Sequence, residues 1–218
     1  MSEKSTSLTN MNPAIEQMKS TIRAKYAQQN QTAKKGQIVF VGSSLMEIFP
    51  IEKMQQSLGL DKVIYNRGIR ATTTADLLTS MDLCIFDLAP SKIFINIGTN
   101  DLGFGVPEAT FLANYDEILR RIKEKLPETQ VFVMAYYPVN PVADFGESEA
   151  EHESLFARRT NEILELASGK VAQLAKKYNF EFINVNAGLA DADGNLRKEL
   201  TFDGVTCILP GIKFYLKI

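Results

Sequence analysis

The fold can be read outward from one stretch, Phe94-Ile95-Asn96-Ile97-Gly98-Thr99-Asn100-Asp101. Its first half is apolar at nearly consecutive positions, which predicts a strand that is covered on both faces. A glycine then ends the strand, and three polar residues follow it. In open parallel sheets, ligands bind at the carboxyl ends of the strands. Polar residues at this place are therefore candidates for chemistry.

Similar apolar runs recur along the chain and alternate with longer stretches of helical periodicity. The predicted strands are Gln37–Val41, Lys62–Tyr65, Lys92–Ile97, Gln130–Ala135 and Glu181–Val185. The predicted helices are Pro13 to about Gln31, Ile51–Leu58, Thr73–Met81, Pro107–Lys125 and Ser148–Tyr178. This alternation predicts an α/β fold with a five-stranded parallel sheet. Lys34-Lys35-Gly36 marks the junction between an N-terminal helical extension, residues 1–36, and the main domain, residues 37–218.

Composition narrows the class of protein. The 218 residues fit one domain, and the 45% of hydrophobic residues suffice for a full core. A net charge of −2 leaves no basic surface for nucleic acid or anionic lipid, and no apolar run approaches the roughly 20 residues of a membrane span. The first residues lack the apolar core of a signal peptide, so a cytoplasmic protein is expected. The two cysteines, Cys84 and Cys207, are expected in the core.

Polar residues also follow the first and second predicted strands. Ser44 stands at the turn after the first strand, where its hydroxyl would project beside N–H groups that can stabilise an oxyanion. Asn66-Arg67-Gly68 follows the second strand, and its glycine lets the backbone approach a ligand closely. Asn100 is a neutral donor suited to an oxyanion hole. Each of these motifs is common in ordinary turns when it occurs alone. Because they follow three successive strands, together they indicate a functional site.

Together these turns resemble the sequence blocks of the SGNH, or GDSL, family of serine esterases, lipases and acylhydrolases. Gly42-Ser43-Ser44-Leu45 corresponds to its Gly-Asp-Ser-Leu block, Asn66-Arg67-Gly68 to Asn-x-Gly, and Gly98-Thr99-Asn100-Asp101 to Gly-x-Asn-Asp. Asp203-Gly204-Val205-Thr206 stands at the Asp-x-x-His block. The resemblance spans about Ile38 to the C-terminus. It implies a three-layer α/β/α fold of the flavodoxin-like type, here with an added N-terminal helix.

The resemblance also implies a role for each position. Ser44 would be the nucleophile that attacks an ester carbonyl. The N–H groups of Ser44 and Gly68, with the Asn100 side chain, would form the oxyanion hole, and Asp203 would orient the catalytic histidine. No metal or organic cofactor is implied. The expected partner is a small-molecule ester, acylated carbohydrates included, and neither nucleic acid nor membrane; the acyl group, the alcohol and the oligomeric state are left open.

One departure from the family pattern bears on activity. Thr206 stands where the histidine should accept the proton of Ser44, and threonine has no group that titrates near neutral pH. Loss of the base predicts a rate lower by on the order of 10⁴- to 10⁶-fold. His152 is the only histidine, and its acidic helical surroundings give no reason to place it in the crevice. Ser43 and Arg70 replace an aspartate and a glycine of the family, which are smaller departures.

The tail after Val205 is atypical as well, because the family's His-x-x-x-x-Gly-Tyr and closing helix are absent. Codons for Val205–Ile218 can be chosen so that one added C gives Val-His-Met-Tyr-Ser-Ala-Gly-Tyr-Lys-Val-Leu-Phe-Glu-Asn. A frameshifted tail is therefore one hypothesis, which resequencing the gene tests. A natural loss of the base is the other. The tail as written is expected to pack poorly and to lower the melting temperature relative to a restored one.

Two functions of different classes follow. The first is a serine ester hydrolase that works through an acyl-Ser44 intermediate. The second is a catalytically dead protein that binds a ligand in the same crevice. A flavodoxin-like nucleotide binder is disfavoured, because no Gly-rich phosphate loop follows the first strand. Tyr136–Asn140, after the fourth strand, is expected either to contact substrate or to pack as a loop, and Pro141–Glu153 is expected to form a rim over the site.

Overall fold

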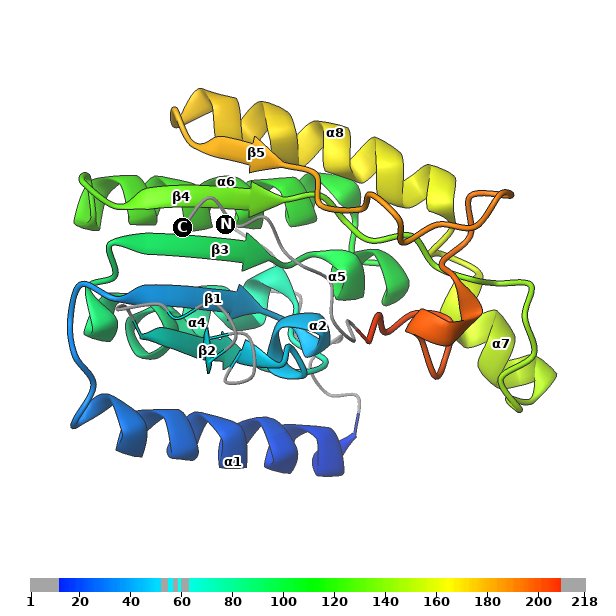
Figure 1. Ribbon diagram of the computed structural model, residues 1–218, viewed down its shortest axis with the longest axis horizontal. Coiled ribbons are helices and arrows are strands. Elements are labelled where there is room, and N and C mark those ends of the chain that lie inside the picture. The colour runs from blue at the N-terminus through cyan, green and yellow to red at the C-terminus, as the bar shows by residue number, and fades with distance from the viewer. Residues whose placement is uncertain (1–11, 52–54, 57–58, 60–62, 209–218) are drawn as a thin grey trace.

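The structure is a computed structural model that describes residues 12–51, 55–56, 59 and 63–208. Five strands form one parallel sheet in the order β2-β1-β3-β4-β5. Their bounds are β1 Ile38–Gly42, β2 Ile64–Gly68, β3 Lys92–Asn96, β4 Gln130–Met134 and β5 Glu181–Ile183. All five arrows in Figure 1 point the same way, so the carboxyl ends of the strands share one edge. The predicted parallel sheet is confirmed.

Helices connect the strands, as the alternating pattern predicts. Their bounds are α1 Pro13–Asn30, α2 Ser44–Glu47, α4 Thr74–Cys84, α5 Thr99–Gly103, α6 Glu108–Lys125, α7 Glu149–Phe156 and α8 Asn161–Lys177. Helix α1 begins where predicted, because the Asn12 side chain accepts a hydrogen bond from the N–H of Ala14 at 2.9 Å. Most of the predicted helix Ile51–Leu58, and the tail 209–218, lie outside the described residues.

The sheet is covered on both faces, which confirms the three-layer architecture. On one face, α4, α6 and α8, with Tyr26 of α1, pack apolar side chains against the strands. On the other face, Phe40, Phe94 and Phe132 stack across three strands, with ring centroids 4.8 and 4.7 Å apart. Apolar residues of the segment 189–207 complete this second cluster. Both cysteines are buried, as expected.

One helix prediction is wrong. The predicted helix Ser148–Tyr178 is two helices, α7 and α8, separated by Ala157–Thr160. The Thr160 side chain accepts a hydrogen bond from the N–H of Ile163 at 3.2 Å and so begins α8. Apolar residues recur at helical spacing on both sides of the break, which is why the sequence pattern concealed it. The break also places Arg159 at a turn rather than inside a helix.

Helix α1 is attached to the rest of the fold by polar contacts. Lys19 is only 3% exposed, and its Nζ lies 3.0 Å from the carboxylates of both Glu16 and Asp76. The Tyr26 hydroxyl donates to the carbonyl oxygen of Gly68 at 2.6 Å. These contacts tie α1 to α4 and to the end of β2. Within the described ranges, no helix has the length and hydropathy needed to cross a membrane.

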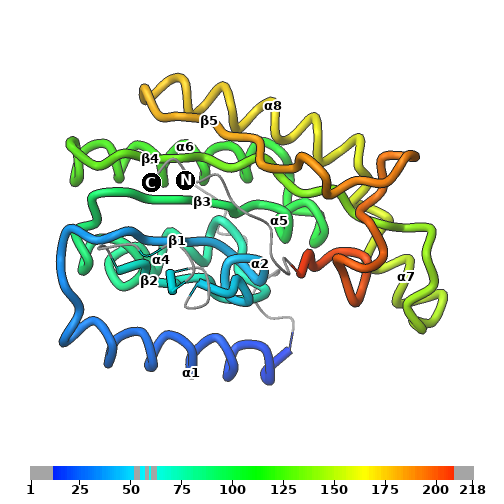
Figure 2. The backbone as a smooth tube through the Cα atoms, viewed as in Figure 1, coloured from blue at the N-terminus to red at the C-terminus, as the bar shows by residue number. Residues whose placement is uncertain are grey.

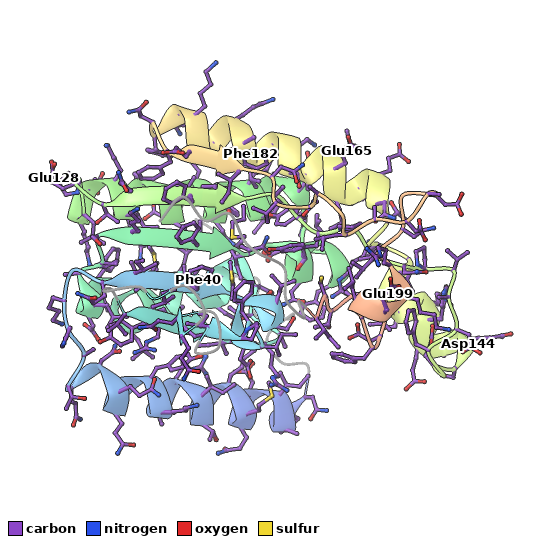
Figure 3. All side chains as sticks on the ribbon, in the orientation of Figure 1. Phe40, Glu128, Asp144, Glu165, Phe182 and Glu199 are labelled. Carbon is purple, nitrogen blue, oxygen red and sulfur yellow. The ribbon has the colours of Figure 1, made fainter. Side chains whose placement is uncertain are left out.

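The loops that could carry a site gather at one end of the molecule. In Figures 1 and 2, α2, α5 and the orange-to-red segment 186–208 lie beyond the carboxyl ends of the strands. Figure 3 shows Phe40 at the sheet, whereas Asp144 and Glu199 lie at this loop-bearing end, near α7. The fold therefore assembles the predicted blocks at a single edge, where parallel sheets bind ligands.

Candidate active site

Ser44 begins α2 directly after β1. Gly42 of β1 pairs with Gly68 of β2, and a Cβ on Gly68 would lie 2.2 Å from the backbone nitrogen of Glu47. The absent side chain lets α2 pack directly on the sheet. Because Ser44 opens a helix, its N–H is among those that lack a partner inside the helix. In the part of the chain that is described, the Ser44 hydroxyl forms no hydrogen bond.

Ser44 lines a small crevice of about 40 Å³. Other polar residues line this crevice from distant parts of the chain, among them Asn100 from α5, Arg159 from the turn between α7 and α8, and Thr206 from the segment after β5. Val139 and other apolar residues form part of its wall. The structure thus brings together three of the sequence-predicted positions and a buried arginine that was not predicted.

Asn100 is the second residue of α5. Gly98, just before it, has a φ of +123°, and a Cβ there would lie 2.3 Å from the Tyr136 hydroxyl, so the turn requires glycine. Asn100 Nδ2 donates to the carbonyl oxygen of Thr72 at 2.9 Å. An amide nitrogen carries two hydrogens, so a second one is left for a ligand. Asn100 can therefore serve as an oxyanion donor beside Ser44.

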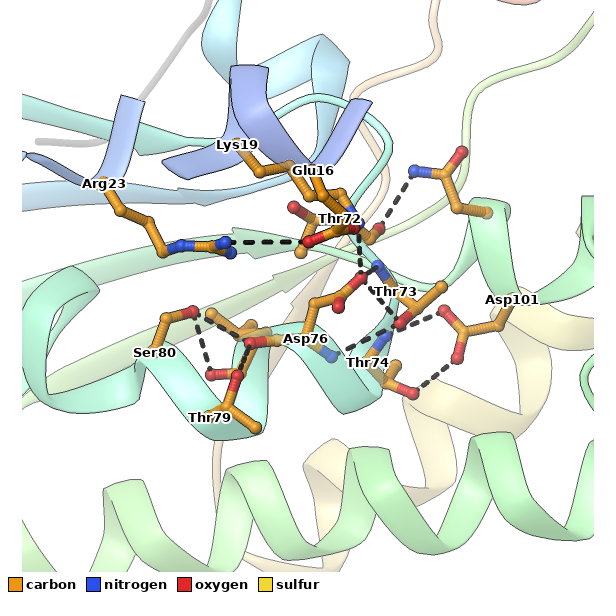
Figure 4. A network of polar contacts seen from close by, with 12 residues as sticks. Glu16, Lys19, Arg23, Thr72, Thr73, Thr74, Asp76, Thr79, Ser80 and Asp101 are labelled. Atoms are coloured by element: carbon orange, nitrogen blue, oxygen red, sulfur yellow. Dashed lines mark hydrogen bonds and ion pairs between the residues drawn. The ribbon is translucent and has the colours of Figure 1, made fainter. Parts of the chain in front are cut away.

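The loop before α4 supports this turn from behind. Asp101 is fully buried, and its carboxylate accepts hydrogen bonds from the Thr74 hydroxyl at 2.5 Å and the Thr74 N–H at 2.9 Å. Burial raises the pKa of the Asp101 carboxyl to about 6. Figure 4 shows this pair beside Asp76 and Lys19, which are themselves joined at 3.0 Å. Polar contacts therefore extend from α1 to the turn after β3.

Gly68 lies apart from this crevice. It is not among the described residues that line it, and its N–H donates to Asn66 Oδ1 at 2.8 Å. The N–H that was predicted as an oxyanion donor is therefore already used. Asn66 Nδ2 in turn donates to the carbonyl oxygens of Met46 and Glu47 at 2.6 and 3.1 Å. In this structure, the Asn-x-Gly block fastens β2 to α2.

Asp203 and Thr206 are joined to each other. The Thr206 hydroxyl donates to Asp203 Oδ2 at 2.7 Å, and its N–H donates to Oδ1 at 2.6 Å. The N–H of Val205 donates to Oδ1 as well, at 2.9 Å. The carboxylate thus stands beside position 206, where a triad acid must be. The threonine that it holds cannot accept the proton of Ser44.

His152 lies on α7 and outside the group that lines the crevice. Its Nε2 is 2.8 Å from the carbonyl oxygen of Pro141, and its ring packs against Phe156 with centroids 4.8 Å apart. These contacts agree with the expectation that it does not replace the missing base. Among the described residues, no group of three or more His, Cys, Asp or Glu side chains could hold a metal ion.

The segment after β4 shows both of the expected behaviours. Tyr137 and Val139 line the crevice, so they could contact a substrate. Tyr136 and Asn140 are buried and hold loops together, since the Tyr136 hydroxyl donates to the Ile97 carbonyl oxygen at 2.8 Å. Asn140 Nδ2 likewise donates to a carbonyl oxygen of the segment after β5, at 2.7 Å. Some side chains of this segment therefore line the crevice, and others hold the surrounding loops in place.

Arg159 is the residue of the crevice that sequence reasoning missed. It is 6% exposed and lines the crevice with Ser44 and Asn100. Burial lowers the pKa of its guanidinium, and the negative charge of Asp203 acts against that shift. Arginine is seldom buried, and position 159 falls inside what the sequence pattern indicates as a continuous helix. The break between α7 and α8, once known, is the only signal that would have singled it out.

A serine hydroxyl after β1, an amide after β3 and an Asp-containing turn after β5, on a three-layer parallel α/β fold, define the class of SGNH-type hydrolases. The sequence model of the GDSL-like lipase/acylhydrolase family matches residues 51–212, and this chain belongs to that family. By family, it is a carboxylic ester hydrolase. The match begins after Ser44, so the prediction that Ser44 is the nucleophile depends on its motif and its place in the crevice.

Solved structures share this fold. A Streptococcus pneumonia protein assigned as a platelet activating factor is 30% identical, with 94% of this chain and 92% of that chain covered and a TM-score of 0.77. A GDSL-like lipase from Bacteroides thetaiotaomicron VPI-5482 is 21% identical, with 85% and 88% covered and a TM-score of 0.65. The acetylxylan esterase Axe2 from Geobacillus stearothermophilus is 15% identical, with 80% and 88% covered and a TM-score of 0.59. No curated protein matches the chain in sequence.

Proposed function

We propose that the crevice is the acyl-transfer site of a serine ester hydrolase in which Ser44 is the nucleophile. The observation that carries the proposal is that Ser44 and Asn100, from separate blocks, line one crevice at the carboxyl ends of β1 and β3. Ser44 Oγ would add to the ester carbonyl, the alcohol would leave, and water would then hydrolyse the acyl-Ser44 ester.

Two donors are available to the tetrahedral oxyanion. These are the N–H of Ser44 at the start of α2 and the second Nδ2 hydrogen of Asn100. The N–H of Gly68 could join them only by giving up its bond to Asn66. Removal of one such donor from a serine hydrolase lowers kcat by roughly 10²- to 10³-fold. Asn100→Ala is therefore expected to reduce any turnover by that factor.

The missing base sets the level of activity. The proton of Ser44 has no acceptor at position 206, because the Thr206 hydroxyl donates to Asp203. A histidine at position 206 would present a ring N–H to the same carboxylate and a free ring nitrogen to Ser44. We therefore expect the chain as written to be a very slow esterase and Thr206→His to be a faster one. Acylated carbohydrates are the substrate class that likeness to an acetylxylan esterase suggests.

A second function is favoured by the same hydrogen bonds. Thr206 satisfies the Asp203 carboxylate through its hydroxyl and its N–H, so the loss of the histidine leaves no buried acceptor unpaired. A crevice that is complete without a base suits a protein that binds an acylated ligand and does not turn it over. In this alternative, Ser44 and Asn100 hold the acyl carbonyl by hydrogen bonds alone.

Hydrolysis of 4-nitrophenyl acetate separates the two functions. It is measured for the chain, for Thr206→His, and for each of these with Ser44→Ala. The esterase proposal expects Thr206→His to raise kcat/KM by at least about 10³-fold, and Ser44→Ala to abolish the gain. A tail-restored variant, which carries the histidine and the closing residues after Val205, serves as a second test. If neither variant exceeds its Ser44→Ala control, the esterase proposal fails and the binding protein stands.

A further inference from the structure

The side chain of Arg159 is a buried cation that has no anionic partner. No carboxylate oxygen of the described residues lies within 4.0 Å of its guanidinium. Its hydrogen bonds go to neutral acceptors, the carbonyl oxygens of Thr99 and Leu155 at 3.1 Å each and Asn100 Oδ1 at 3.5 Å. A guanidinium has five N–H donors, so these three bonds leave two without an acceptor among the residues that the structure describes. This side chain is 6% exposed and lines the crevice.

The surrounding structure makes room for this group. A Cβ on Gly103 would lie 2.0 Å from the Arg159 Cζ, so the guanidinium occupies the space that a side chain at position 103 would fill. The Phe104 ring lies 5.7 Å from the same carbon. The contacts with Thr99 and Asn100 fix the guanidinium against the turn that carries the oxyanion donor. Arg159 is therefore held in one place beside the reacting centre, as a recognition group must be.

The charge of Arg159 is not neutralised by Asp203. The Asp203 carboxylate attracts it from a distance, but the two groups form no ion pair within 4.0 Å, and Asp203 accepts its hydrogen bonds from Val205 and Thr206 instead. An arginine cannot lose its proton, and a buried charge without a partner is costly. Arginine forms its strongest hydrogen bonds in pairs, to the two oxygens of a carboxylate or a phosphate. Its two free donors thus match an oxyanion that arrives from the crevice.

We propose that Arg159 binds an oxyanion, a carboxylate or a phosphate, that the substrate carries close to its ester bond, so that this site selects anionic esters over neutral ones. This proposal deepens the proposed function and rests on it, because the bound anionic ester is a substrate only if the chain is an esterase. If the chain is a binding protein, the same residue selects an anionic acylated ligand. Arg159 is then a specificity-determining residue, because it contacts the ligand and takes no part in proton transfer.

Anion binding at equilibrium tests this without turnover. The melting temperature of the full chain is measured with sodium propionate, with inorganic phosphate and with sodium chloride at the same ionic strength. Propionate or phosphate is expected to raise it by roughly 3–6 °C at about ten times its Kd, and chloride is not. When the two anions are compared at the same concentration, the one that gives the larger rise is the preferred oxyanion. Arg159→Gln is expected to lose the rise, whereas Arg158→Gln, which removes the exposed neighbour of the same charge, is expected to keep it.

A second measurement covers the case in which Arg159→Gln fails to fold. In the unmodified chain, titration with propionate or phosphate should shift the NMR signals of the Arg159 Nε–H and the Asn100 side-chain amide and leave that of Arg158 unchanged. The proposal is overturned if neither anion acts beyond chloride, or if the shifts occur elsewhere. Ester hydrolysis is a separate readout, so a chain that binds the anion without turnover refutes only the esterase proposal.

Discussion

Lys19 and Arg159, two of the three buried cations among the described residues, stand in contrast; the third, Arg67, lies outside the crevice. Lys19 is 3% exposed and lies 3.0 Å from two carboxylates, one on its own helix and one on α4. Arg159 is 6% exposed and meets only carbonyl and amide oxygens within hydrogen-bonding distance. Lys19 joins α1 to the fold, whereas Arg159 lines a crevice at the carboxyl edge of the sheet.

The difference distinguishes buried charges that stabilise the fold from buried charges that are available to bind a ligand. A buried ion pair is balanced within the protein, and its loss leaves the partner uncompensated. A buried charge without an ionic partner is stabilised either by neutral groups of the protein, as Arg67 is by Asn30, Gln29 and the Tyr26 ring, or by a ligand. Asp101 is an intermediate case, since its carboxylate is buried and hydrogen-bonded to Thr74, with no cation at ion-pair distance among the described residues. Substitution of each charge tests this division.

The largest effect is expected for Lys19→Met. The variant leaves the Asp76 carboxylate buried without its cation, so the free energy of unfolding should fall by about 3–5 kcal/mol. Urea denaturation measures the change, and Lys25→Met, an exposed lysine of the same helix, is the matched control. A loss below about 1 kcal/mol would show that Lys19 is not the attachment of α1 that its contacts indicate.

A smaller effect, and one that depends on pH, is expected for Asp101→Asn. The raised pKa of Asp101, about 6 in the folded state, exceeds the value near 3.9 of an unfolded chain. Between these values the folded state keeps a proton that the unfolded state has released, so this group's contribution to stability falls as pH rises through the window. The free energy of unfolding of the variant, relative to that of the wild type, should therefore be about 2 kcal/mol more favourable at pH 7 than at pH 4.

The control for this prediction is Asp82→Asn, because Asp82 is an exposed carboxylate of α4. Denaturant titrations of the three proteins at pH 4, 5, 6 and 7 give the comparison. A constant difference between Asp101→Asn and wild type across this range would mean that the pKa of Asp101 is the same in the folded and unfolded states.

The smallest effect on stability is expected for Arg159→Met. The variant loses hydrogen bonds to two carbonyl oxygens but also removes a buried charge that has no counter-ion. These changes oppose each other, so the free energy of unfolding in low-anion buffer should change by less than about 1 kcal/mol. Chemical denaturation of Arg159→Met and Lys19→Met under the same conditions ranks the two losses in free energy of unfolding. A loss as large as that of Lys19→Met would place Arg159 among the residues that hold the fold.

The sequence predicts the parts of this molecule in which local pattern and tertiary structure agree. Apolar runs such as Phe94–Ile97 mark the sheet, because strands buried on both faces admit little else. Ser44, Asn100 and Thr206 could be placed at one edge, because parallel strands end together. The α7–α8 break could not be seen, since amphipathic spacing on both sides carries no information on a four-residue turn between them.

The sequence also does not predict which of several competing acceptors a given N–H group will bond to. Gly68 has an N–H that a motif can assign to a ligand, but the Asn66 side chain two residues away takes it. Arg159 is concealed for the opposite reason. An arginine is expected at the solvent-exposed surface, and only the structure shows that its guanidinium fills the space beside Gly103. In both cases the contact depends on side-chain geometry, which residue type and sequence spacing do not predict.

The Thr206–Asp203 contact has a consequence for how such a chain persists. Thr206 binds both carboxylate oxygens through its hydroxyl and N–H, with the help of Val205, so this turn is closed by hydrogen bonds without a histidine. Quality control in the cell acts on unfolded protein, and threonine at this position leaves no unpaired group in the turn that would favour unfolding. Selection on residue 206 would therefore act through the chemistry of the crevice rather than through the folding of this turn.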